Sequence, residues 1–302
     1  METVRIVAEQ TLIMFLLIGT GYVLFRKGKL SLAGSRDMAS LMVTIIIPAV
    51  IVNSLAVEYT AEKAKTLLLC SALSAVLLAV SLVISHLILK ENPIDDFASG
   101  FSNPGFFGIP LVQAAFGNDA VFYIAPFIVG INILQFSYGV RLMGRTSSSD
   151  WRHYARNPIF LSAVIGLILF FIPVSPPSPV SSALNYIAGL NAPIAMIVMG
   201  GYLAQTDFLS LFTSARLYAL CFCRLFLIPA VSLLVISLFP ADMQIRSALL
   251  IAASCPVGAN VAAYAQLNGH DYAYAVKTVV LSTLLSIVSL PAVLTVARFI
   301  WN

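Results

Sequence analysis

Hydrophobic residues occur along this chain in long runs that short polar segments separate. A helix that crosses a bilayer needs about 20 consecutive apolar residues. On this basis we expect ten transmembrane helices, at residues 5–25, 37–57, 66–89, 97–116, 120–142, 157–173, 181–204, 214–239, 245–267 and 272–299. The pattern therefore predicts an all-α polytopic membrane protein.

The fourth of these runs contains residues that interrupt helices. Within residues 101–117, FSNPGFFGIPLVQAAFG, lie Pro104, Gly105, Gly108 and Pro110. Proline removes a backbone donor, and glycine adds conformational freedom. Backbone groups freed in lipid find no water, so such a break persists only where it is buried in protein or lines a polar cavity. We therefore expect a discontinuous helix beside a cavity.

A second interrupted run lies about 150 residues further on, at residues 251–269, IAASCPVGANVAAYAQLNG, with Cys255, Pro256 and Gly258 near its middle. Each interrupted run is the fourth of five predicted spans in its half. Because five is odd, the halves cross the membrane in opposite senses. We predict two inverted five-helix repeats, 1–142 and 157–302, joined by a cytoplasmic loop at 143–156, with discontinuous helices 4 and 9. That architecture places a substrate site near the bilayer midplane.

The breaks also suggest what binds there. A helix that restarts in the membrane presents free N–H groups with an effective charge of about +0.5, which suits an anion. Asn103 and Asn260 stand beside the breaks, and Asn53 and Asn132 are polar residues on apolar spans. We take these four asparagines as candidate substrate ligands. The alternative is that the prolines and glycines only kink helices for packing.

Ionisable residues inside the spans are cationic. Every acid falls at a span end or in a loop, which disfavours coupling through a buried carboxylate. Lys277, about six residues into the last span, either snorkels to the interface, pairs with a substrate carboxylate or replaces a coupling cation. Arg224, about eight residues into its span, bonds carbonyls at a helix break, anchors the bundle or touches substrate. The sequence leaves these roles open.

Composition excludes several classes of protein. The 302 residues are 60% hydrophobic and 10% charged, far from the composition of a soluble domain. We expect no nucleic-acid partner because no basic stripe lies on a soluble segment. The four cysteines lie in apolar runs without a CxxC pair, and the three histidines lie at span ends or in loops, so neither a metal site nor a cofactor is expected. No enzyme motif is present.

The order of several motifs resembles the auxin efflux carrier family, which includes plant PIN-type carriers and bacterial permeases for small carboxylates. The similar stretches cover nearly the whole chain: NPGFFGIPLVQAAFGNDA from Asn103, ARNPIF from Ala155, APIAMIVMGGYLA from Ala192, RLFLIP from Arg224, and CPVGAN followed by LSTLLSIVSLPAVL. The resemblance implies a scaffold and a transport subdomain, with spans four and nine as crossing helices. It also implies that Asn103 binds a substrate carboxylate.

The sequence and the resemblance together predict a secondary transporter that moves a small organic anion, such as malate, malonate or an auxin-like acid, by alternating access. A membrane-embedded ligand sensor and a cation-coupled antiporter remain alternatives. The central loop is much shorter than in plant members, which favours a bacterial permease in the cell membrane. Lys and Arg placement predicts that both termini lie outside the cytoplasm. A homodimer and a coupling proton or sodium ion are left open.

Overall fold

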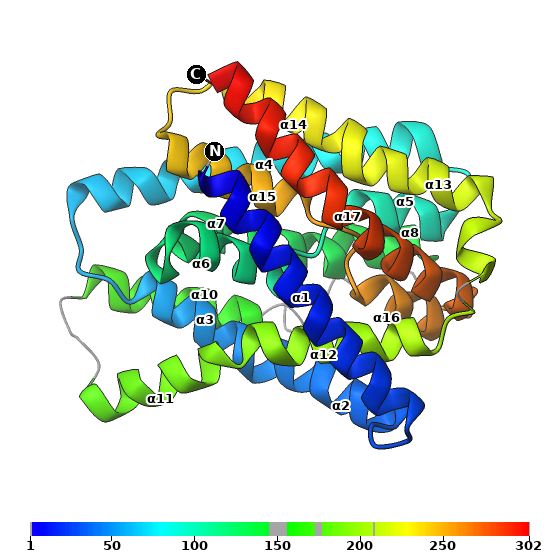
Figure 1. Cartoon of the computed structure of the whole chain (residues 1–302). Helices are drawn as coiled ribbons and strands as arrows, with labels where there is room; N and C mark the ends of the chain where they lie inside the picture. Colours follow the sequence, from blue (N-terminus) through cyan, green and yellow to red (C-terminus); the bar gives the residue numbers. More distant parts are fainter. Residues whose placement is uncertain (1, 145–155, 173–176, 208, 302) are drawn as a thin grey trace.

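The computed structural model describes residues 2–144, 156–172, 177–207 and 209–301. Throughout this part of the chain the regular structure is helical, apart from an isolated antiparallel bridge between Ser102 and Val257. Most of the predicted central loop, 143–156, lies outside the described residues. Figure 1 shows the helices packed into one bundle, with the two termini near each other at one end.

The helices follow the predicted runs closely. In chain order they are α1 (Glu2–Arg26), α2 (Leu32–Leu41), η1 (Met42–Ile46), α3 (Ile47–Leu55), α4 (Ala61–Leu89), α5 (Pro93–Gly100), η2 (Pro104–Gly108), α6 (Ile109–Phe116), η3 (Asn118–Ala120), α7 (Val121–Leu134), η4 (Gln135–Gly139), α8 (Val140–Leu142), α10 (Pro158–Phe171), α11 (Ser178–Gly189), α12 (Asn191–Ala204), η5 (Leu209–Phe212), α13 (Ala215–Phe222), η6 (Cys223–Leu227), α14 (Ile228–Ser237), α15 (Met243–Ser254), α16 (Asn260–Leu267) and α17 (Tyr272–Trp301).

Seven helical stretches of the described chain are long and apolar enough to cross a membrane by length and composition. They are Val4–Arg26, Leu32–Leu55, Ala61–Leu89, Asn118–Leu142, Ser178–Ala204, Ala215–Ser237 and Tyr272–Trp301. The three other predicted spans are the two interrupted runs and residues 157–173, where α10 has only 14 residues. The chain is therefore a multi-pass membrane protein, and the count of ten spans stays a prediction.

Three π-helical turns, η1, η2 and η6, each end two residues before a proline. Pro48, Pro110 and Pro229 each occupy the second position of the α-helix that follows such a turn. A proline ring clashes with the carbonyl four residues earlier and removes one hydrogen bond. The wider turn accommodates both effects, so the helices continue through these prolines with a local distortion.

The helices form two groups. The first contains α1, α2, α3, α10, α11 and α12, of which α1 and α12 cross at backbone distance. A Cβ atom at Gly21 would lie 2.3 Å from the carbonyl oxygen of Ile197, and one at Gly200 would lie 2.2 Å from that of Ile18. Only glycine permits this approach, which is typical of membrane helices. The crossing fixes the first group as a packed unit.

The second group contains α4, α5, α7 and α13 to α17, and it holds both interrupted runs. α4 packs against α5, α7 and α14, whereas α17 packs against α13, α15 and α16. Contacts of α1, α3 and α12 with α6, α7 and η2 join the groups, and Figure 1 shows α1 lying across both of them. The interrupted runs thus lie where the two groups meet.

Candidate functional site

The two interrupted runs meet at their breaks. The non-helical residues are 101–103 in the first run and 255–259 in the second. The amide of Asn103 donates to the carbonyl of Pro256, and the amide of Gly258 donates to the carbonyl of Phe101, both at 2.9 Å. Together they form the isolated antiparallel bridge. Segments 150 residues apart are therefore bonded backbone to backbone. We call this contact between residues 101–103 and 255–259 the crossing.

Neighbouring side chains bond other polar groups of the breaks. The hydroxyl of Ser102 donates to the carbonyl of Ala252 at 3.1 Å, and the amide of Val257 donates to the hydroxyl of Ser282 on α17 at 3.0 Å. All residues of both breaks are buried. This is how non-helical backbone is stabilised away from water.

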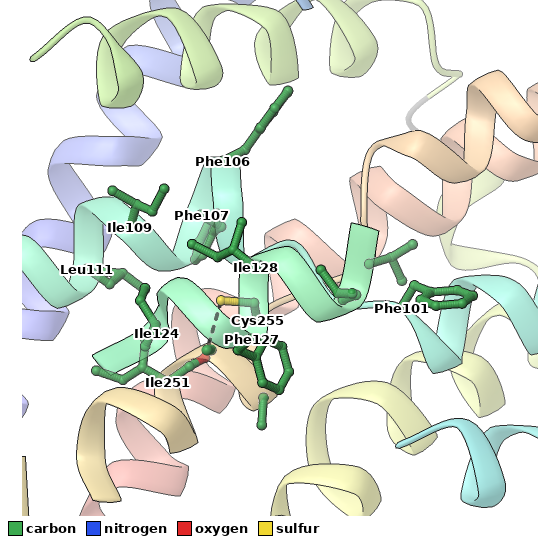
Figure 2. Close-up of a cluster of buried hydrophobic side chains, with 14 of the residues drawn as sticks. Phe101, Phe106, Phe107, Ile109, Leu111, Ile124, Phe127, Ile128, Ile251 and Cys255 are labelled. Carbon is green, nitrogen blue, oxygen red and sulfur yellow. Dashed lines mark hydrogen bonds between the residues drawn. The ribbon is translucent and has the colours of Figure 1, made fainter. Parts of the chain in front are cut away.

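The first break is narrower than the sequence pattern suggested, whereas the second contains Cys255, Pro256 and Gly258, as expected. Helical structure resumes at Pro104, so Gly108 and Pro110 lie inside continuous helix, and Pro110 shapes the π-helical turn η2 instead of ending a helix. Gly108 has a different use: a Cβ there would lie 3.1 Å from the Sγ of Cys255. Figure 2 shows Cys255 within an apolar cluster, its thiol bonded to the carbonyl of Ile251, while Phe106 points away from that cluster.

Asn103 lies at the start of the restarted helix and acts as its N-cap. Its side-chain Oδ1 accepts from the amide of Phe106 at 3.2 Å, which stabilises the helix end. The Nδ2 group of the same side chain is buried and has no hydrogen-bond partner in the described structure. Asn103 is only 6% exposed, so this donor does not reach bulk water. An unpaired buried amide is costly, and a ligand oxygen would satisfy it.

Asn260 is the first residue of α16, on the other side of the crossing. Its Nδ2 donates to Oε1 of Gln135 in η4 at 2.8 Å. The donor of Asn260 is therefore already paired, unlike that of Asn103. Because Gln135 lies in η4, this bond joins two helical segments.

A small cavity of about 30 Å³ lies beside the crossing. It is lined by Val43, Ile47, Ser102, Asn103, Pro104, Gly105, Phe106, Ile131, Asn132, Gln135, Ile159, Gly258, Ala259 and Asn260. Val43, Ile47 and Ile159 belong to the first group of helices, and the others belong to the second. This volume holds about one water molecule. The cavity between the two groups is therefore too small for an organic anion.

The other candidate ligands are placed differently. Asn132 lines this cavity, although its Nδ2 donates within its own helix to the carbonyl of Ile128 at 2.8 Å. Asn53 bonds Asn185 at 3.0 Å and lines a second cavity of about 360 Å³. Lys277 is half-buried on α17 and lines neither cavity. The structure thus brings together Asn103, Asn132 and Asn260, and separates Asn53 and Lys277 from them.

Arg224 is almost fully buried, with 1% of its surface exposed. Its Nη1 donates to the carbonyl of Ser99 at 2.9 Å and to the hydroxyl of Ser81 at 3.0 Å, and its Nη2 donates to the carbonyl of Ala253. Ser99 lies in the last turn of α5, and Ala253 lies in the last turn of α15. Of the roles considered from the sequence, bonding to carbonyls at the breaks is the one that the structure shows.

Two acids are more buried than their place at a span end suggested. Asp95 accepts from Nε of Arg216 at 2.5 Å and from the hydroxyl of Tyr274 at 2.8 Å. Asp96 is bonded to Nδ1 of His86 at 2.7 Å. The sequence shows that both acids follow an Asn-Pro pair, which is typical of a helix start. It does not show their hydrogen-bond partners, because those residues belong to other helices.

Comparison with known proteins shows the family of the chain. The sequence profile of a family described as "Membrane transport protein" matches residues 6–294. A protein of Rhizobium meliloti (strain 1021) named "Putative malonate transporter" is 26% identical over 236 residues, which cover 74% of this chain and 73% of that protein.

Proposed function

The chain belongs to the membrane transport protein family, the auxin efflux carriers that its motifs resemble, and from this premise we propose that it is a secondary transporter of a small organic anion. The family membership makes it a transporter and not an enzyme. The substrate class and the mechanism rest on the site.

The observation that carries the proposal is the free Nδ2 donor of Asn103. It is buried, has no described partner and lines the cavity at the crossing. Two restarted helices, η2–α6 and α16, begin beside the same cavity, and their N-termini add positive potential. A carboxylate oxygen placed there accepts from Asn103 and from backbone amides. A cationic ligand would face the wrong ends of both helices.

The construction of the cavity supports alternating access. Its walls come from both groups of helices, and its volume of about 30 Å³ excludes an organic anion in this conformation. Binding therefore requires the groups to separate on one side of the membrane, and release requires separation on the other. We propose that the first group is the scaffold and that the second group, with the crossing, moves against it.

Malonate is the first substrate to test, since the Rhizobium meliloti relative is named for it. A dicarboxylate has one carboxylate for Asn103 and a second one for the other restarted helix. The termini lie at the same end of the bundle, as an even number of crossings requires, which supports ten spans. We propose the bacterial cell membrane as the location, with both termini outside the cytoplasm, as the placement of Lys and Arg favours.

Uptake by liposomes containing the purified protein tests the proposal. We expect saturable uptake of radiolabelled malonate, competed by unlabelled malonate and less well by malate or indole-acetate. Asn103→Asp is the matched inactive variant, because it keeps the capping oxygen while replacing the free donor with a negative charge. The proposed function is wrong if no carboxylate of this panel is taken up and none changes the thermal stability of the protein.

A further inference from the structure

The crossing has four helix ends, and only two of them favour an anion. α5 ends at Gly100 and α15 ends at Ser254, directly before the two breaks. The last carbonyls of a helix have no partner within it, and each such end carries an effective charge of about −0.5. The N-termini of the restarted helices carry about +0.5 each. Without another charge, the two pairs of ends would largely cancel at the crossing.

Arg224 binds at the two negative ends. Its guanidinium bonds the carbonyl of Ser99, at the end of α5, and that of Ala253, at the end of α15. Its third partner, the hydroxyl of Ser81, itself donates to the carbonyl of Gly100 at 2.8 Å. One side chain of η6 therefore joins the ends of both half-helices.

The charge of Arg224 has no carboxylate partner among the described residues. A buried guanidinium without an opposite charge is strongly destabilising unless other negative groups solvate it. Here those groups are the two helix C-termini, whose combined effective charge of about −1 matches one arginine. The pairing explains how Arg224 is tolerated at 1% exposure.

We propose that Arg224 is a positioning residue that makes the crossing selective for anions. As a fixed internal cation it neutralises the two negative helix ends, so that the positive ends dominate at the cavity. It also holds α5 and α15 at the distance that lets their breaks bond each other. Arg224 does not line the cavity, so it acts through the backbone and not on the substrate. The inference rests on the proposed anion transport.

Two variants of Arg224, with side chains of similar length, separate the effect of its charge from that of its hydrogen-bond geometry. Arg224→Lys keeps the charge with fewer donors, and Arg224→Gln keeps one donor group without the charge. We expect Arg224→Gln to raise the KM for malonate about tenfold or more, and Arg224→Lys to raise it about threefold or less, because a buried charge near helix ends is worth up to about 2 kcal/mol. Arg246→Gln is the control, since the guanidinium of Arg246 also bonds a carbonyl, that of Phe239, outside the crossing.

A second measurement does not depend on the substrate. Arg224→Ala leaves the two helix ends without a cation and opens space for one. We expect its thermal stability in detergent to fall and to be partly restored by millimolar guanidinium, but not by equal concentrations of sodium or choline. Wild-type protein and Arg246→Ala should not respond to guanidinium.

These outcomes separate the two proposals. If wild-type protein takes up no carboxylate while guanidinium still restores Arg224→Ala, anion transport is wrong and the neutralising role of Arg224 stands. If Arg224→Gln and Arg224→Lys change the KM equally, the charge does not set anion selectivity. If guanidinium restores no stability to Arg224→Ala, Arg224 does not act as a cation at the helix ends.

Discussion

The two breaks at the crossing lie about 150 residues apart in the sequence and differ in how they are stabilised. The first has three non-helical residues, and its own Asn103 caps the helix that follows. The second has five, its following helix has no side-chain cap, and the amide of Val257 depends on Ser282 of another helix. The helix after the first break is thus capped by its own chain segment, whereas the second break takes a bond from another helix.

This difference gives the two asparagines unequal chemistry. The oxygen of Asn103 caps its own helix, and its nitrogen remains free to donate. The nitrogen of Asn260 donates to Gln135. An anion needs a donor, so we propose that the first break contributes more to binding than the second. The comparison shows that two breaks of similar sequence pattern need not have the same hydrogen-bonding role.

The largest expected effect comes from a change that prevents the breaks from meeting. In Gly258→Val the Cβ would lie 3.0 Å from the carbonyl oxygen of Ser102 and 3.3 Å from that of Phe101, both backbone atoms that cannot move independently. We expect loss of malonate uptake and lower thermal stability. Gly130→Val is the control, because its Cβ would meet only the movable side-chain end of Leu78, at 2.9 Å, and Gly130 does not line the cavity. Equal losses in both variants would contradict the backbone crossing.

The next largest effect is expected at Asn103. Asn103→Ala removes the free donor and the cap, and we expect malonate affinity to fall about 10- to 100-fold, as for a lost hydrogen bond to a charged group worth about 1.5–3 kcal/mol. Asn103→Asp keeps the cap and should abolish anion binding with little loss of stability. Binding by isothermal titration, with thermal unfolding in parallel, checks both. Normal affinity in Asn103→Asp would remove Asn103 from the site.

Much of the fold was predictable because the bilayer imposes it. Runs of about 20 apolar residues gave the helices of the bundle to within a few residues, and the prolines marked where helices are distorted. The position of the breaks was less exact. The sequence predicts Pro110 as a helix breaker, but a π-helical turn accommodates this proline and the helix continues.

The site was predictable only in part, because its contacts join distant segments. Asn103 and Asn260 were readable beside the breaks, but nothing in the sequence shows that one donor is free and the other bonded to Gln135. The role of Arg224 depends on carbonyls that lie 125 and 29 residues away in the chain. Lys277 shows the converse: a cation on an apolar span that the fold keeps away from the cavity.

Asn260→Ala should have a smaller effect than Asn103→Ala. It removes the hydrogen bond to Gln135 but no free donor, so we expect only a few-fold change in malonate affinity, in line with about 0.6 kcal/mol for a hydrogen bond between membrane helices. The same titration measures it. If Asn260→Ala weakens binding as much as Asn103→Ala does, the two breaks contribute equally and the asymmetry is wrong.

The smallest effect on transport is expected at Ser282, which supports the second break without facing the cavity. Ser282→Ala leaves the buried amide of Val257 unpaired, at a cost of about 1–3 kcal/mol in the free energy of unfolding. Malonate KM should change less than twofold, because the affected amide is not at the cavity. Ser286→Ala is the control, since the hydroxyl of Ser286 bonds only within its own helix, to Thr283. Equal stability of the two variants would show that the second break does not need the support of α17.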